Sequence, residues 1–336
     1  MDLAVCPAYP GRFDRANRPG PSHRTGMSQQ VAPTGRRTSS DWALFWLLSL
    51  IWAGAYQMTR LAVDKGHEDL GLPAAWVIVG RLTIGAAVLW AILLAMGKRL
   101  PPLSDRRRWR TIATMGLTGS VFPFFLITTA QETVNSSLAA LYTAASPLFV
   151  ASAAHFLFQD EKLTRGSSVG VMLGFAGVAL LFGPDAIRGF GSASTLAQIL
   201  LIFATLFYAI SSLIARGAPQ MDPFVFATGF VTVAAVASWP LAFTVDPGEV
   251  NASWKNWIGV IGLGIGPSAI AQALYMLLIA RTSATFLSLT GYSIPVMAAA
   301  LGFVLFGETQ TWNAMLAFLM ILGGVWLARH GGGAKA

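Results

Sequence analysis

The sequence is short of charged residues, cysteine and histidine, and each shortage excludes a class of protein. Charged residues make up 11% of the 336 positions, less than half of the roughly 25% typical of soluble domains. A water-soluble surface cannot be built from so few charges. The single cysteine, Cys6, excludes disulfides and thiolate metal sites. With four histidines and no Walker loop or HExxH motif, we expect no enzyme activity, no cofactor and no metal.

The sequence contains long runs without a charged residue, which soluble proteins do not contain repeatedly. Hydrophobic residues form 54% of the chain, and the runs are near or above the ~20 residues that cross a ~30 Å hydrocarbon core as a helix. The pattern predicts an all-α polytopic membrane protein with short connections. Its ten expected transmembrane helices are residues 42–63, 73–97, 110–131, 135–158, 166–183, 194–215, 223–245, 256–280, 284–307 and 310–329.

The two ends of the chain differ from the runs between them. Residues 1–41 contain Pro, Gly, Ser and six Arg without an apolar run, which predicts a disordered basic cytoplasmic tail. Residues 330–336 are expected to form a second, short cytoplasmic tail. Either Met1 or Met27 can serve as the start, and the sequence leaves both open.

The basic residues are distributed unevenly between the connections. If the N-terminus is cytoplasmic, the inner segments hold 18 Lys and Arg, whereas the outer ones hold only Lys65, Arg188 and Lys255. The positive-inside rule then places both termini in the cytoplasm. The net charge of +8 therefore reflects topology, so we expect the lipid bilayer as a partner and not a nucleic acid. Ten spans can enclose a cavity in one chain, which favours a monomer or a weak homodimer.

The chain contains an internal repeat. Residues 133–158 align with 281–306 at an offset of 148, which pairs Pro147 with Pro295 and Leu157 with Leu305. The chain is thus predicted to hold two five-helix repeats, at residues 42–183 and 194–329. Two odd-numbered repeats in series cross the membrane in opposite senses, which is the inverted arrangement of many secondary transporters.

Four segments carry a resemblance to a known family. They are LIWAGAYQMTR, PAAWVIVGRLTIGAAVLW, SSLAALYTAASPLFVASAAHFLFQDEKLT and ATFLSLTGYSIPVMAAALGFVLFGETQT. They resemble the EamA-type branch of the drug/metabolite transporter superfamily over about residues 42–329. The resemblance implies a ten-helix inverted-repeat fold in the inner (cytoplasmic) membrane of a bacterium, and commonly the export of amino acids or related metabolites. The chain departs from the family at Gln159-Asp160, where Gly is more frequent, so either Asp160 or Glu161 can end the helix.

Ionisable residues inside a membrane are candidates for function because they are costly to bury. Arg81 lies within the second span and can bind an anionic group, or it can be structural and bond to backbone carbonyls. His155 is expected to be a packed or interfacial histidine rather than a proton relay. Glu132, Glu161 and Glu308 stand at span ends, where we expect them to fix helix termini more than to bind substrate.

No Asp or Glu lies in the middle of a span, so the usual carboxylate for proton or Na⁺ coupling is missing. A facilitator or exchanger is the simpler prediction. Polar and aromatic residues within spans are candidates to line a substrate pathway for a neutral or zwitterionic ligand, although hydrogen bonding between helices explains each of them equally well. They are Trp52, Tyr56, Gln57, Arg81, Tyr142, Thr143, Tyr208, Gln272, Tyr275, Ser288, Thr290 and Tyr292, with Pro147 and Pro295 as hinges.

Three alternatives to an amino acid or metabolite carrier remain. A sugar-nucleotide, organic-anion or lipid-intermediate carrier is the closest, but it would want several basic residues in its cavity, and only Arg81 qualifies. A membrane-embedded enzyme would need clustered carboxylates, histidines or a nucleophile with its base. A channel would need a selectivity ring or a symmetric pore, and an inverted repeat fits alternating access better.

Overall fold

A computed structural model of the protein describes residues 38–64, 71–157, 162–188, 193–246, 250, 252–282, 284–287 and 289–330. The secondary structure of this described part is entirely helical, with no strand. Its elements are α1 (Ser39–Val63), α2 (Ala74–Ala95), α3 (Arg106–Gly116), η1 (Leu117–Val121), α4 (Phe122–Ala130), α5 (Ser136–Thr143), α6 (Ser146–Leu157), α7 (Arg165–Arg188), α8 (Ala193–Arg216), α9 (Pro223–Ala242), α10 (Trp254–Ile265), η3 (Gly266–Ile270), α11 (Ala271–Arg281), α12 (Ala284–Leu287), α13 (Thr290–Phe306) and α14 (Trp312–His330).

Six of the expected membrane spans coincide with helices that are long and apolar enough to cross a bilayer. They are Ala74–Ala95, Arg106–Ala130, Ser136–Leu157, Ser194–Ala215, Pro223–Ala242 and Trp254–Tyr275. Three further apolar helices are shorter: Arg165–Leu181, Thr290–Phe306 and Trp312–Ala328. Helix α1 covers the first expected span, but polar residues such as Gln57 and Arg60 interrupt its apolar sequence. The all-helical prediction is confirmed, and the count of ten spans stays a prediction.

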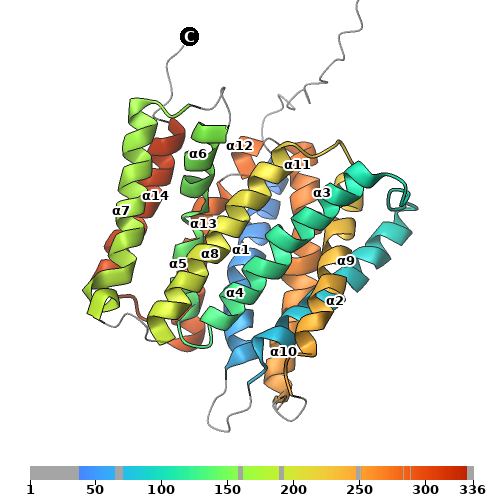
Figure 1. Ribbon diagram of the computed structural model, residues 1–336, viewed down its shortest axis with the longest axis horizontal. Helices are drawn as coiled ribbons and strands as arrows, with labels where there is room; N and C mark the ends of the chain where they lie inside the picture. Colours follow the sequence, from blue (N-terminus) through green and yellow to red (C-terminus); the bar gives the residue numbers. More distant parts are fainter. Residues whose placement is uncertain are drawn as a thin grey trace, which may run out of the picture. The chain divides into compact units, whose positions relative to one another are not determined.

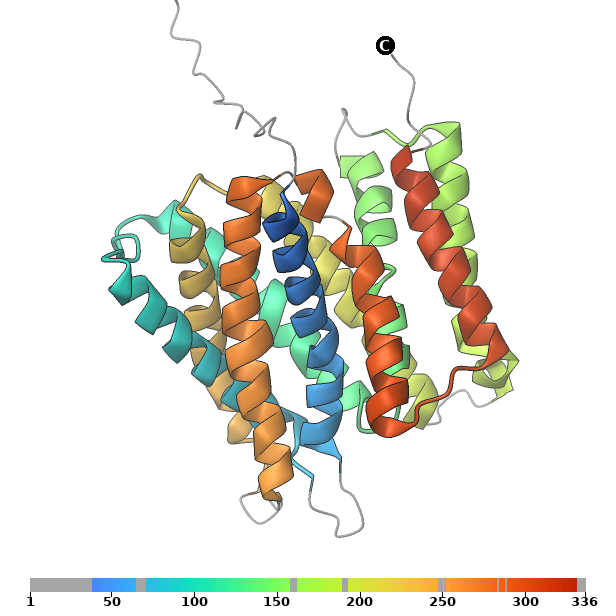
Figure 2. The same ribbon diagram turned by 180° about the vertical axis from the view of Figure 1, so that it is seen from behind.

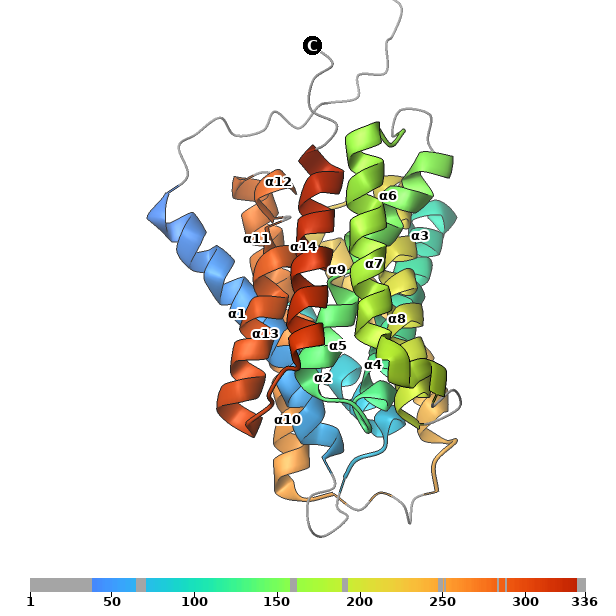
Figure 3. The same cartoon turned by 90° about the vertical axis from the view of Figure 1, so that its left-hand side faces the viewer.

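Helices α7 and α14 lie side by side along their length (Figures 1 and 3). Glycines make this close approach possible, because a Cβ added at Gly324 would lie 2.5 Å from the backbone nitrogen of Gly174. A Cβ added at Gly170 would likewise lie 2.7 Å from the carbonyl oxygen of Gly324. The two glycines of the fifth expected span therefore serve helix packing.

Helix α1 packs between helices from the C-terminal part of the chain. Figure 2 shows α1 in blue with α10 and α11 on one side and α13 on the other. In the same way α8 contacts α3, α4, α5 and α6, and α2 packs on α9. The first and last thirds of the chain are thus interleaved, so polar side chains distant in sequence can meet.

Two long helices contain a π-helical turn next to a proline. In η1 the N–H of Phe122 donates to the carbonyl of Leu117, and in η3 the N–H of Ala271 donates to Gly266, both five residues back. Pro123 and Pro267 lack the N–H of a normal helical turn, and their rings clash with the preceding turn. A widened turn accommodates this, and such turns are frequent at functional sites.

The two prolines expected to act as hinges occupy different helical positions. Pro147 is the second residue of α6, directly after the chain leaves the helix at Ala144 and Ala145. Pro is tolerated there because first-turn N–H groups have no partner within the helix. Pro295 is buried inside α13 and interrupts its hydrogen bonding. Their role as hinges stays a prediction.

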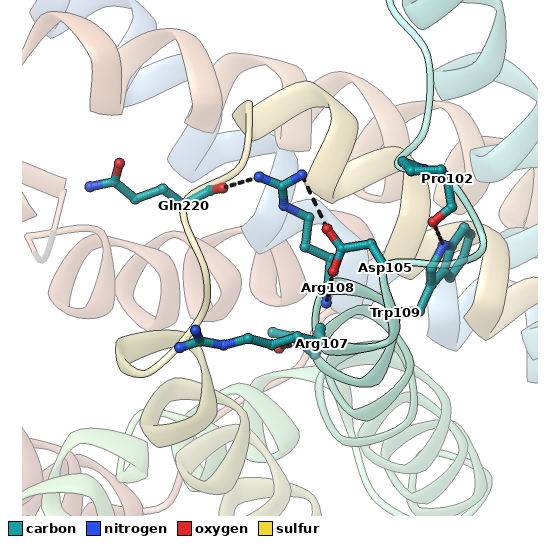
Figure 4. Close-up of polar contacts among 7 residues, drawn as sticks. Pro102, Asp105, Arg107, Arg108, Trp109 and Gln220 are labelled. Atoms are coloured by element: carbon teal, nitrogen blue, oxygen red, sulfur yellow. Dashed lines mark hydrogen bonds and ion pairs between the residues drawn. The ribbon is translucent and has the colours of Figure 1, made fainter.

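Polar contacts hold the basic segment at the start of α3 (Figure 4). Asp105 caps the helix by accepting from the backbone N–H of Arg108 at 3.1 Å, and it forms an ion pair with the guanidinium of Arg108 at 3.3 Å. Nη2 of Arg108 reaches the carbonyl of Gln220 at 3.5 Å, and Trp109 donates to the carbonyl of Pro102 at 3.2 Å. This segment therefore connects the start of α3 to the loop after α8.

Candidate functional site

Arg81 in α2 is a buried cation, with 5% of its surface exposed. Its Nε and Nη2 both donate to the hydroxyl of Ser268 in η3 at 3.3 Å. The guanidinium carbon lies 3.8 Å from the centre of the Phe124 ring of α4. A hydroxyl and an aromatic face both stabilise a cation, but neither neutralises its charge.

Two tyrosines lie within electrostatic range of the Arg81 guanidinium. They are Tyr56 in α1 and Tyr208 in α8, and both are half-buried. The hydroxyl of Tyr56 also forms a short hydrogen bond with Thr143 in α5. We name Tyr56, Arg81, Phe124, Tyr208 and Ser268 the Arg81 cluster; its members come from five elements on both sides of the chain's midpoint.

Further aromatic residues adjoin the cluster along α1. Trp52 lies one helical turn before Tyr56 and therefore shares its face. Its ring centre is 5.6 Å from that of Tyr275 in α11. Both rings are half-buried. Aromatic and polar surfaces are thus adjacent, which suits a ligand with an apolar part and a charged end.

Gln57 lies next to Tyr56 but makes a separate set of contacts. Its Nε2 donates to the hydroxyl of Ser136 at 3.2 Å and to the carbonyl of Ala298 at 2.7 Å. Nearby, Nε2 of Gln131 donates to the carbonyl of Tyr56 at 3.0 Å. Gln57 and Gln131 are almost fully buried, so they bind helices α1, α4, α5 and α13 together.

Glu308, two residues after the end of α13, caps the N-terminus of α5. Its Oε1 accepts from the backbone N–H and the hydroxyl of Ser136 at 3.0 and 2.8 Å, and its Oε2 accepts from the N–H and hydroxyl of Ser137. Burial alone would raise the pKa of Glu308, but the bonds from Ser137 and Ser136 are together stronger, and the pKa falls below its usual value. Glu308 thus fixes a helix terminus, as expected, although on another helix than its own.

The remaining predicted pathway residues are placed elsewhere. Tyr142 is fully buried and donates to Oε1 of Gln198 at 2.7 Å, and Thr290 donates to the carbonyl of Leu287 at 2.6 Å. Gln272 and Tyr292 are half-buried. Their contribution to a pathway stays a prediction, and Ser288 lies outside the described residues.

The other ionisable candidates have structural contacts. Nδ1 of His155 accepts from the backbone N–H of Leu163 at 3.0 Å, and its carbonyl accepts from Lys162 at 2.6 Å. His155 therefore holds the chain that leaves α6, in agreement with a packed histidine. Glu132 is exposed after α4, and Glu161 lies outside the described residues.

Sequence reasoning did not find Ser268 or Phe124, the two direct contacts of Arg81. The only available signal for Ser268 was its position after Pro267, because a proline within a long apolar run marks a distorted helix. Phe124 had no signal, since phenylalanine is common in membrane helices. Among the described residues, no group of three or more His, Cys, Asp or Glu is arranged to hold a metal ion.

The model of the EamA-like transporter family matches this chain twice, over residues 41–183 and 195–329. The chain belongs to this family. The two matches cover most of the chain and include every member of the Arg81 cluster. EamA-like proteins are membrane transporters, which agrees with the apolar helices.

Several curated proteins resemble this EamA-like chain over most of its length. The uncharacterized inner membrane transporter YedA of Escherichia coli strain K12 is 27% identical and covers 86% of this chain and 90% of its own. A probable terminal-alkyne amino-acid exporter of Streptantibioticus cattleyicolor is also 27% identical, covering 85% and 92%. The aromatic amino acid exporter YddG of Ancylobacter novellus is 28% identical, covering 73% and 84%.

A solved crystal structure shares the fold of this EamA-like protein. It superposes with a TM-score of 0.57 at 23% sequence identity, covering 87% of this chain and 97% of the other. At this identity the likeness concerns the fold alone.

Proposed function

We propose that this EamA-like protein is a secondary transporter that moves amino acids or similar small metabolites across the cytoplasmic membrane. In this proposal its two family-matched segments are inverted five-helix repeats that alternate in access. The uneven distribution of Lys and Arg supports cytoplasmic termini. The absence of an acid in the middle of any expected span favours a facilitator or exchanger.

The observation that carries the proposal is the composition of the Arg81 cluster. Arg81, Tyr56 and Phe124 come from the first matched segment, and Tyr208 and Ser268 come from the second. A site between repeats is where alternating access can expose a ligand to either side. Two relatives carry names of amino-acid exporters, which supports amino acids as the first class to test.

Counterflow with the purified protein in proteoliposomes tests this function. We expect saturable exchange of one group from a labelled panel of neutral, aromatic and basic amino acids. Flux that does not saturate or exchange would indicate a channel, and consumption of the labelled compound would indicate an enzyme. Uptake against a gradient under an imposed pH difference would contradict the facilitator or exchanger mechanism.

One observation favours a second candidate, a carrier of organic anions. The charge of Arg81 is buried and faces only neutral partners among the described residues. An organic acid would supply the missing negative charge without needing an amino group. Labelled organic acids therefore belong in the same counterflow panel, and their exchange without that of amino acids would favour this candidate.

A further inference from the structure

The charge of Arg81 is not neutralised in the described part of the chain. Arginine keeps its charge at every accessible pH, and only 5% of this residue's surface is exposed. The ion pairs among the described residues are Lys98–Asp222 and Asp105–Arg108. No described carboxylate therefore lies within ion-pair distance of Arg81.

The guanidinium also has hydrogen-bonding capacity left over. It carries five N–H donors, and two of its nitrogens share a single acceptor, the Ser268 hydroxyl. Within the described residues Nη1 has no hydrogen-bond acceptor. Phe124 covers one face of the group, so the planar edge that carries Nη1 and Nη2 is the side from which an acceptor can bind.

A buried cation without a counter-ion is costly, and an incoming anion removes this cost. The edge of an arginine matches a carboxylate in two parallel hydrogen bonds. The rings of Tyr56 and Tyr208 are half-buried and within electrostatic range. Their rings and hydroxyl groups therefore lie in the same region of the helix bundle as the guanidinium.

We propose that Arg81 binds the carboxylate of the transported substrate through Nη1 and Nη2, and that the half-buried rings of Tyr56 and Tyr208 contact the remainder of the molecule. Ser268 is then a positioning residue that holds Nε and Nη2 in place. This assignment rests on the proposed transport function. It names the substrate class as amino acids or organic acids with a free carboxylate, and it excludes their amides and the corresponding amines.

Matched acid and amide probes test the assignment on the unaltered protein. The panel consists of labelled phenylalanine, leucine and phenylacetate in counterflow, each competed by its own unlabelled acid and by its amide. We expect the acid to compete at least tenfold better than the amide, because the amide lacks the charge that pairs with Arg81. Equal competition by acid and amide would overturn the assignment and leave the transport function standing.

Substitution supplies the second arm of the test. We expect Arg81→Gln to lower the apparent affinity for the acid by roughly 10- to 100-fold, as for a lost charge-assisted contact. Arg81→Lys keeps the charge without the fork and should lose less. Arg60→Gln is the matched control, since it removes a half-buried arginine of α1 outside the cluster. The apparent affinities are compared only between variants that elute as a single, equally monodisperse species on size-exclusion chromatography.

The outcomes separate the two proposals. Retained exchange of the acid by a monodisperse Arg81→Gln protein, or an equal loss in Arg60→Gln, would contradict the role of Arg81 alone. Exchange of none of the acids would contradict the transport function and the assignment together. If Arg81→Gln does not fold, the competition of acid against amide on the unaltered protein decides the question.

Discussion

Arg81 in α2 and Phe230 in α9 make similar backbone contacts in the two family-matched segments, which we call the first half (residues 41–183) and the second half (195–329). Gly116 and Gly264 are 148 residues apart. Gly264 allows its helix to approach the backbone at Arg81, and Gly116 allows its helix to approach the backbone at Phe230. A Cβ added at Gly264 would lie 3.2 Å from the carbonyl oxygen of Arg81, and one added at Gly116 would lie 2.7 Å from that of Phe230. The backbone contact is repeated, while the side chain changes from a cation to an aromatic ring.

A second pair of contacts shows the same relation. Arg108 and Asn256, again 148 residues apart, each reach backbone carbonyls of the other half. Arg108 reaches the loop after α8, and Asn256 reaches the end of α1. Asn256 is buried and donates to the carbonyls of Leu61 and Asp64, both at 3.0 Å. Arg108 is half-buried and reaches Gln220 at 3.5 Å. Here too the framework is shared and the charge is not.

The comparison teaches that the two halves share a scaffold but differ in where charge is placed. The repeated glycine contacts depend on backbone shape, so the fold needs them whatever the substrate is. Arg81 has no charged counterpart in the second half. A ligand bound between the halves would therefore face a cation from the first half and no matching charge from the second. We therefore expect residues that differ between the halves to recognise the substrate, and residues that are shared by the halves to serve helix packing.

The largest effect is expected where the last helices of the two halves meet. A Cβ added by Gly324→Ala would lie 2.5 Å from the nitrogen of Gly174 and 2.6 Å from the carbonyl oxygen of Gly170. Both neighbours are backbone atoms, so α7 and α14 must separate, which we expect to cost at least the roughly 1–3 kcal/mol of an overpacked core. Thermal unfolding in detergent, followed by size-exclusion chromatography, measures the loss.

The adjacent glycine provides the matched control. A Cβ added by Gly323→Ala meets only the Leu173 side chain, at 4.0 Å. We expect this variant to be as stable as the unaltered protein or slightly more so, because Ala favours a helix over Gly. Equal tolerance of both substitutions would contradict the close packing of α7 on α14.

An intermediate effect is expected at Glu308, which connects the end of α13 to the start of α5. Glu308→Ala removes a charged acceptor from four donor groups of Ser136 and Ser137, so we expect a loss of about 1.5–3 kcal/mol. Because folding lowers the pKa of Glu308, its stabilisation is present above the ordinary carboxyl value of 4.5 and disappears as the pH falls below it.

Glu308→Gln tests this pH dependence separately from the loss of contacts. The amide cannot titrate, so the melting temperatures of the unaltered protein and the variant should differ at pH 7 and converge in acid. A constant difference across this range would mean that the charge of Glu308 does not stabilise the contact with α5.

The sequence predicted the features that depend on local composition. Apolar runs located six helices within a few residues. Arg81 was conspicuous because it is a charged residue inside such a run. The contacts of Glu308 with Ser137 and of Arg81 with Ser268 could not be predicted, because each joins residues far apart in the chain and depends on how the helices pack. The π-helical turns were also missed, since Pro123 and Pro267 indicate a distortion without specifying its geometry.

The smallest effect is expected from the two corresponding contacts at Arg108 and Asn256. Asn256→Ala removes two donated bonds and the acceptor of Ser253 from a buried position, which we expect to cost about 1–3 kcal/mol. Arg108→Ala removes a long contact and a partly exposed ion pair, whose expected contribution is below about 1 kcal/mol. The two variants are compared by thermal unfolding at equal ionic strength.

The difference between these two variants tests whether scaffold and charge are separate properties. If Arg108 acts mainly as one of the basic residues that orient the chain, Arg108→Ala should leave the melting temperature nearly unchanged at low and at high salt. A salt-sensitive loss as large as that of Asn256→Ala would show that the positive charge is itself part of the structural contact. The two halves would then correspond at the start of α3 and of α10 both in backbone geometry and in the stability that each contact contributes.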